Sequence, residues 1–293
     1  MQIAFHIGAN CTDEDRLLKS ILKNANTLLQ QGVAVPGPGK YRSLIRETIQ
    51  ALDGAAPQAD TRNILIDAIV ENDDVDRLVM SNDNFICIPN RIFDDGLFYG
   101  QAEAKVRALR RLFAGDDIEL FIGIRNPATF LQETFKRSKS TSISTYLGLM
   151  HPEDISWADV IRRIRQGAPD CPLTVWCNED TPLLWEQLIR RISDVTTDTD
   201  VIGGLDMLAS IITDDGLRIL MEQLRVTPPP TDAARHEMIA AIWEEHAIPD
   251  ALEEVIELGD LDPALVGEMT ESYEDDIAEI AEMDGVTLLM PFT

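Results

Sequence analysis

Polar side chains with the chemistry to handle a phosphate-like group follow the first short hydrophobic run of this chain. The run 2–7 alternates in hydrophobicity as a β-strand does, and the glycine-containing turn 8–10 interrupts it. From Thr12 onward the apolar residues recur at helical spacing as far as Gly32. A strand that turns through glycine into a helix offers free backbone amides to a phosphate. In this chain the turn is followed at once by three acids: Asp13, Glu14 and Asp15.

Two further candidate residues follow hydrophobic runs that read as buried strands. Asp83 lies just beyond the run 76–81, and Arg125 directly follows the run 118–124. A carboxylate at the end of a strand can act as a general base, and a guanidinium group suits a phosphate. Because ligands bind at the carboxyl ends of the strands in open α/β sheets, we expect the two side chains near the first turn.

Strands and helices alternate along most of the chain, which predicts a parallel sheet. Runs 173–177 and 286–290 read as further strands, and 33–35 is a shorter extended run. Amphipathic helical patterns separate them. We therefore predict a three-layer α/β/α sandwich with a central parallel sheet of about five strands and helices on both faces.

Three short motifs together resemble the sulfotransferase family, particularly its bacterial members. They are His6-Ile7-Gly8-Ala9-Asn10-Cys11-Thr12, Pro36-Gly37-Pro38-Gly39-Lys40-Tyr41 and Arg125-Asn126-Pro127. The resemblance spans most of residues 1–192 and implies the sulfotransferase branch of the P-loop fold.

The resemblance assigns a role to each candidate residue. It implies that the turn of Gly8, Ala9, Asn10, Cys11 and Thr12 holds the 5'-phosphosulfate of 3'-phosphoadenosine 5'-phosphosulfate, the donor. It implies that Arg125 binds the 3'-phosphate, and that Asp83 takes the proton of the acceptor hydroxyl. The loop with Lys40, Tyr41 and Arg42 either faces the acceptor side of the cleft or is a surface loop.

The chain departs from the family pattern at both phosphate contacts. Cys11 stands where the family has lysine, the three acids replace small and hydroxyl residues, and Glu133 replaces the serine that accompanies Arg125. At about 4 to 8 Å and an effective dielectric near 20, each added pair of like charges repels by roughly 2 to 4 kcal/mol. We therefore expect no bound cofactor and a sulfotransferase-like protein that acts as a binding or regulatory module. The alternative is an active sulfotransferase that uses the donor.

The acids also permit simpler interpretations. Thr12 and Asp15 fit a helix capping box, and acids favour the positive end of a helix dipole. A metal ion on the three acids is a second possibility, and retained donor binding is a third. Arg125 is a potential ion-pair partner of any of them or of Glu133, and we favour an Asx turn of residues 82–84 over a catalytic role for Asp83.

Composition restricts the function classes. The 293 residues carry a net charge of −26, and residues 195–293 hold 24 acids against three arginines. The negative electrostatic field of so acidic a chain repels nucleic acid. The four cysteines and four histidines form no metal-binding spacing, and no apolar run is long enough to span a membrane. We expect a cytoplasmic protein of one domain, residues 1–293, in which 196–293 is an acidic, mainly helical region with an unidentified partner or acceptor.

Overall fold

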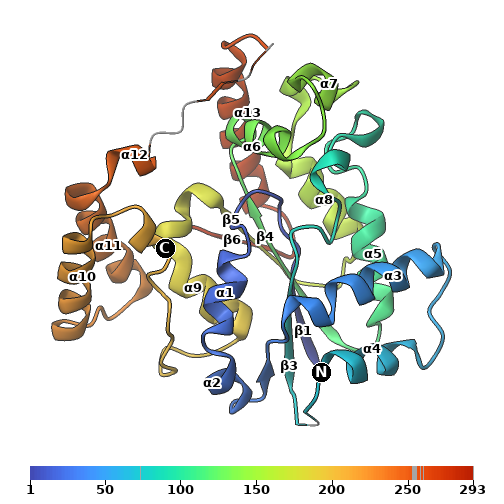
Figure 1. Cartoon of the computed structure of the whole chain (residues 1–293), viewed down its shortest axis with the longest axis horizontal. Helices are drawn as coiled ribbons and strands as arrows, with labels where there is room; N and C mark the ends of the chain where they lie inside the picture. The colour runs from blue at the N-terminus through green and yellow to red at the C-terminus, as the bar shows by residue number, and fades with distance from the viewer. Residues whose placement is uncertain (73, 253–255, 258, 260, 293) are drawn as a thin grey trace.

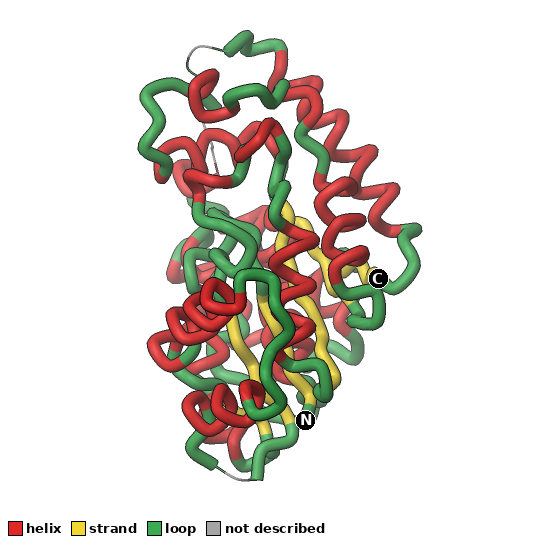
Figure 2. Tube along the Cα trace, turned by 90° about the vertical axis from the view of Figure 1, so that its right-hand side faces the viewer, coloured by secondary structure: helices red, strands yellow, loops and turns green. Residues whose placement is uncertain are grey.

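The computed structural model describes residues 1–72, 74–252, 256–257, 259 and 261–292. Its centre is a sheet of six strands in the order β2-β3-β1-β4-β5-β6, in which every neighbouring pair is parallel. The strands are β1 (Gln2–His6), β2 (Val33–Ala34), β3 (Arg77–Ser81), β4 (Asp117–Ile124), β5 (Leu173–Cys177) and β6 (Val286–Leu289). Figure 2 shows the strands side by side in the middle of the molecule, with helices to either side.

Helices cover both faces of the sheet, so the predicted three-layer α/β/α sandwich is confirmed (Figure 1). Those that pack on one face are α3 (Arg42–Leu52), α4 (Thr61–Ile69), α5 (Ala102–Leu112), α6 (Pro127–Arg137), α7 (Ile143–Leu147), α8 (Trp157–Gly167) and α13 (Leu265–Ala281). Those on the other are α1 (Arg16–Leu22), α2 (Ala25–Leu29) and α9 (Thr181–Ser193).

The strand β1 lies in the middle of the sheet and is buried on both faces. Ile3 and Phe5 belong to the larger hydrophobic core, whereas Ala4 packs with α1 and α9 in the second core. The register pairs Gln2 with both Arg77 of β3 and Asp117 of β4. The residues after β1 therefore lie between the carboxyl end of β3 and the continuing strand β4.

The first helical segment differs from the sequence prediction of one helix from Thr12 to Gly32. The structure has two short helices, α1 and α2, separated at Asn24. The side-chain amide of Asn24 donates to the carbonyls of Ser20 and Ile202, at 2.9 and 2.8 Å. A side chain that bonds the backbone in this way competes with continued helix, and Ile202 comes from a distant part of the chain.

The acidic carboxyl-terminal region is helical, but it also completes the sheet. Helices α10 (Asp214–Val226), α11 (Asp232–His246) and α12 (Pro249–Leu252) form a group beside α9 (Figure 1). A third, smaller core lies between α10 and α11 and includes Leu220, Ile239 and Ile242. The last strand, β6, pairs with β5 at the sheet edge, which confirms the predicted closing strand. In the part of the chain that the structure describes, no helix is long and apolar enough to cross a membrane.

Candidate functional site

The turn after β1 lies where the order of the strands changes direction. From β1 the chain passes to β2 at the sheet edge, returns to β3 beside β1, and then crosses to β4 on the other side of β1. This switch point is where open α/β sheets place their ligands. Beyond His6 the chain stays bonded to β4: the Ala9 amide donates to the Gly123 carbonyl at 2.9 Å, and the Gly123 amide donates to Gly8 at 2.8 Å. The turn is therefore fixed against the longest strand of the sheet.

Asn10 is fully buried and held by a tyrosine 89 residues further along the chain. Its backbone amide donates to the hydroxyl oxygen of Tyr99 at 3.0 Å, and the same hydroxyl donates to the Asn10 side-chain oxygen at 2.6 Å. The Asn10 side-chain nitrogen donates to Asn84 at 3.1 Å. Two of the amides that the resemblance assigns to a phosphosulfate, those of Ala9 and Asn10, thus already have acceptors inside the protein.

Asp13, not Asp15, caps the first helix, so the predicted capping box of Thr12 and Asp15 is wrong. The Asp13 carboxylate, buried to 5 % exposure, accepts from the Leu17 amide at 3.0 Å. The Thr12 hydroxyl turns back and donates to the Ala9 carbonyl at 2.8 Å. Asp15 has a left-handed backbone with φ of 63° and makes no side-chain cap. The box fails because residues 13–15 still belong to the turn, and helical geometry begins only at Arg16.

Asp15 instead forms a two-pronged ion pair with Arg42 at the start of α3. The guanidinium donates to the two carboxylate oxygens at 3.0 and 2.5 Å. The same guanidinium donates twice to the Ser81 carbonyl at the end of β3, at 3.0 and 2.8 Å. The hydrogen bond from Arg42 lowers the pKa of Asp15, against partial burial, which raises it. This pair joins the first turn to the neighbouring strand end.

Glu14 and Glu133 also lie beside cations. Glu14 points outward and pairs with Arg137 at the end of α6. Glu133, on the same helix, pairs with Lys136 at 2.6 Å. Partial burial of Glu133 would raise its pKa, but the hydrogen bond and charge of Lys136, with Arg125 and Arg137 nearby, hold that pKa below its usual value. The Glu133 carboxylate is therefore ionised at neutral pH.

Arg125 is buried at the carboxyl end of β4 and binds the backbone of the first turn. One of its nitrogens donates to the Cys11 carbonyl at 2.8 Å, and another donates to the Thr129 hydroxyl at 3.0 Å. Its own carbonyl accepts from the Trp157 indole at 2.7 Å. The guanidinium and the turn that the resemblance groups together are thus brought together by the fold.

Asp83 follows β3 and packs its backbone against Gly8. A Cβ on Gly8, whose φ is 117°, would lie 3.1 Å from the Asp83 carbonyl oxygen, so only glycine fits this approach. The predicted Asx turn is present, but Asn82 makes it by accepting from the Asn84 amide at 3.2 Å. Burial, followed by the charges of Asp15 and Asp13, raises the pKa of the Asp83 carboxyl. Asp83 is thus a half-buried carboxyl beside the first turn.

The buried thiol of Cys11 and the acids do not gather into a metal centre. Burial raises the pKa of Cys11 to about 11, which keeps the sulfur protonated. Asp13, Glu14 and Asp15 point toward three different partners, Leu17, Arg137 and Arg42. Among the described residues, no group of three or more His, Cys, Asp and Glu side chains is arranged to hold a metal ion.

Sequence reasoning missed Tyr99 and did not predict how Tyr41 fixes the site. Tyr41 is fully buried and bonds the Ser81 backbone at both its amide and its carbonyl, at 2.9 and 2.7 Å. Lys40 instead pairs with Glu71 on the surface. Lys40 therefore fits the surface-loop alternative, whereas the buried Tyr41 fits neither of the two roles considered for the loop. Tyr99 lies in a loop without a chemical motif, so only the fold could reveal its position.

Comparison of the chain with protein families, curated proteins and solved structures gave no significant match.

Proposed function

We propose that this chain is a sulfotransferase-like α/β protein whose donor-binding turn is closed by its own side chains, and that it acts as a binding or regulatory module. The proposal rests on the motif resemblance for the family and on the geometry of the turn for the loss of the donor. On this proposal the phosphosulfate nucleotide does not bind, and the anionic groups at the turn belong to the protein.

The observation that carries this proposal is the buried Asp13 carboxylate on the Leu17 amide. That amide belongs to the helix that begins directly after the turn, and it is already bonded to an anion. A phosphosulfate near the turn would meet the carboxyl groups of Asp13 and Asp15, with Glu14 close in sequence. Its approach would also require the Ala9 and Asn10 amides to give up their bonds to Gly123 and Tyr99.

Isothermal titration calorimetry with 3'-phosphoadenosine 5'-phosphate tests this function. The full chain should give no binding heat at millimolar nucleotide, because both charge and hydrogen bonding oppose the ligand. Binding in the micromolar range would overturn the proposal. Adenosine, which has the base without the phosphates, distinguishes a phosphate-dependent interaction from nonspecific binding of the base.

An active sulfotransferase is the second candidate, and the position of Asp83 favours it. The Asp83 carboxyl has a raised pKa and lies beside the turn, at the edge of the sheet where Arg125 also emerges. A base of raised pKa accepts a proton more readily, as transfer to an acceptor hydroxyl requires. The fit to the donor is poor at the turn itself, where the Ala9 and Asn10 amides are already bonded.

Sulfate transfer from the labelled donor to a panel of hydroxyl acceptors tests the second candidate. Transfer that disappears in Asp83→Asn but remains in Glu14→Gln would support an enzyme with Asp83 as its base. No transfer to any acceptor, combined with no nucleotide binding, would leave the binding-module proposal standing.

A further inference from the structure

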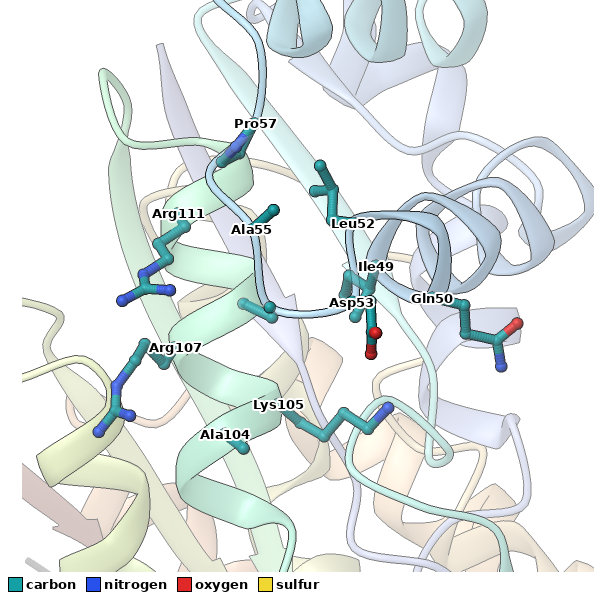
Figure 3. A pocket seen from close by; sticks show the side chains of 12 residues that line it. Ile49, Gln50, Leu52, Asp53, Ala55, Pro57, Ala104, Lys105, Arg107 and Arg111 are labelled. Atoms are coloured by element: carbon teal, nitrogen blue, oxygen red, sulfur yellow. The ribbon is translucent and has the colours of Figure 1, made fainter.

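Two adjoining hollows lie between α3 and α5, on the face of the sheet opposite α1. The hollow nearer the candidate site has a volume of about 530 Å³ and reaches the segment 82–91 after β3. The second has a volume of about 420 Å³ and lies toward the carboxyl end of α3, as Figure 3 shows. Ile49, Gln50 and Lys105 line both hollows, which therefore form one groove. We call this the α3–α5 groove.

The charges on the larger hollow are all of one sign in a chain of net charge −26. Its lining includes four cations and no carboxylate: Arg42, Arg46, Arg91 and Lys105. Such a lining is unusual for so acidic a protein and favours an anion over a cation or a neutral molecule.

Three of the four cations already have carboxylate partners outside the lining. Arg42 pairs with Asp15, and Arg91 pairs with Asp94 at 2.6 Å. Arg46 contacts Glu47 at 3.3 Å. Within the described ranges, by contrast, no carboxylate forms an ion pair with Lys105. The larger hollow therefore has one cation without an ion-pair partner, which suits a ligand with one negative charge, while the smaller hollow adds the carboxylate of Asp53.

The Lys105 side chain also points into the α3–α5 groove. In Figure 3 its side chain extends from α5 across the groove toward α3, whereas Arg107 and Arg111 point away from α3. Arg107 pairs with Glu103 on its own helix. Of the three basic residues of α5 that line the smaller hollow, Lys105 is thus the one that can meet a ligand lying between the helices.

The uncharged lining of the larger hollow consists of six apolar residues and four amide side chains. The apolar lining residues are Ile45, Ile49, Phe85, Ile86, Cys87 and Ile88. Burial raises the pKa of Cys87 to about 12, so its thiol stays neutral and contributes no charge. Ile88 is half exposed at the mouth of the hollow. Pockets of several hundred Å³ with apolar walls and a few placed polar groups are typical small-molecule sites.

We propose that the α3–α5 groove binds an organic monoanion with an apolar body, such as a medium-chain carboxylate, through Lys105. The apolar body lies on the isoleucines and Phe85, and the anionic head pairs with the Lys105 ammonium. The side-chain amides of Asn82, Asn84 and Gln101 on the same lining offer hydrogen bonds to the head. This site does not depend on the loss of the phosphosulfate donor, because it uses neither the first turn nor Arg125.

Calorimetry of the full chain with octanoate, and separately with 1-octanol, tests this site. The two probes share an apolar chain and differ in charge, so octanoate should bind about tenfold more tightly, the usual gain from one charge-assisted hydrogen bond. Lys105→Gln should weaken octanoate binding about five- to tenfold and leave octanol unchanged. Lys19→Gln is the matched control, because Lys19 is exposed on α1 in the opposite layer.

A second variant places a negative charge at the mouth of the groove. Ile88→Asp alters a half-exposed side chain, so folding should be retained, and octanoate binding should again fall about tenfold. The proposal is overturned if octanoate does not bind at millimolar concentration, if both probes bind equally, or if Lys19→Gln weakens binding as much as Lys105→Gln does.

Discussion

The buried carboxylate of Asp13 accepts a hydrogen bond from the backbone amide of Leu17 at 3.0 Å. This bond places a carboxyl group of the protein where the turn after a central parallel strand otherwise meets a ligand anion. Asp15 adds a negative charge nearby, held by Arg42. The local structure is thus stable without a bound anion.

The Asp13 cap predicts a stability effect that separates its hydrogen bond from its charge. Asp13→Ala should lower the free energy of unfolding by about 1 kcal/mol, because the Leu17 amide loses its acceptor. Asp13→Asn should cost less, since asparagine is also a good cap. Urea unfolding of the two variants measures this, and equal losses would show that the charge, not the bond, stabilises the turn.

The pair of Asp15 and Arg42 predicts a specific dependence on acid. Because the pKa of Asp15 is lowered in the folded state, its stabilising effect is present above about pH 4 and is lost as the pH falls through the folded pKa. Asp15→Asn should therefore be less stable than wild type at pH 6, by about 0.5 to 1 kcal/mol for this partly exposed pair. The difference should shrink below pH 4 in urea titrations, and a constant difference would argue against the ion pair.

The pKa of Asp83 should respond to a substitution at Asp13. Burial raises this pKa, and the charges of Asp15 and Asp13 add to the shift. Asp13→Asn removes one of those charges, so the pKa of Asp83 should fall in a carbon-13 NMR titration of the side-chain carboxyl. Glu14→Gln is the control, because Glu14 points outward to Arg137 and should leave the titration unchanged. An unchanged value in both variants would mean that Asp83 does not sense the turn.

Asp180, which precedes α9, predicts a gain of stability when its charge is removed. Burial, and secondarily the charge of Glu179, raise the pKa of Asp180 to about 6. A raised pKa means that the folded state holds a proton that the unfolded state releases, so stability falls as the pH rises from about 4 to about 6. Asp180→Asn should be more stable than wild type at pH 7, and the two should converge near pH 4. Thermal unfolding across this range measures both curves.

The order of strands and helices could be predicted from sequence because the signals are local. The apolar run that became β4 and the alternating run that became β1 are each recognisable within ten residues. The closing strand β6 was predictable for the same reason. Parallel pairing follows from the helices between the strands.

The details of the site depend on contacts between distant segments, which no local pattern records. The break between α1 and α2 uses the carbonyl of Ile202, and the orientation of Asn10 depends on Tyr99. The presence of acids at the first turn was evident from sequence, yet which of them caps the helix was not. The capping box of Thr12 and Asp15 was wrong because the turn is longer than the pattern of apolar residues indicates.

A paired calorimetric titration with 3'-phosphoadenosine 5'-phosphate tests the closed turn most directly. It compares wild type with a variant that carries Cys11→Lys, Asp13→Gly, Glu14→Thr and Asp15→Thr. If the protein's own charges exclude the nucleotide, wild type shows no binding at millimolar ligand and the variant gains measurable affinity. Micromolar binding by wild type, or no gain in a variant that circular dichroism shows to be folded, would contradict the exclusion of the nucleotide by these side chains.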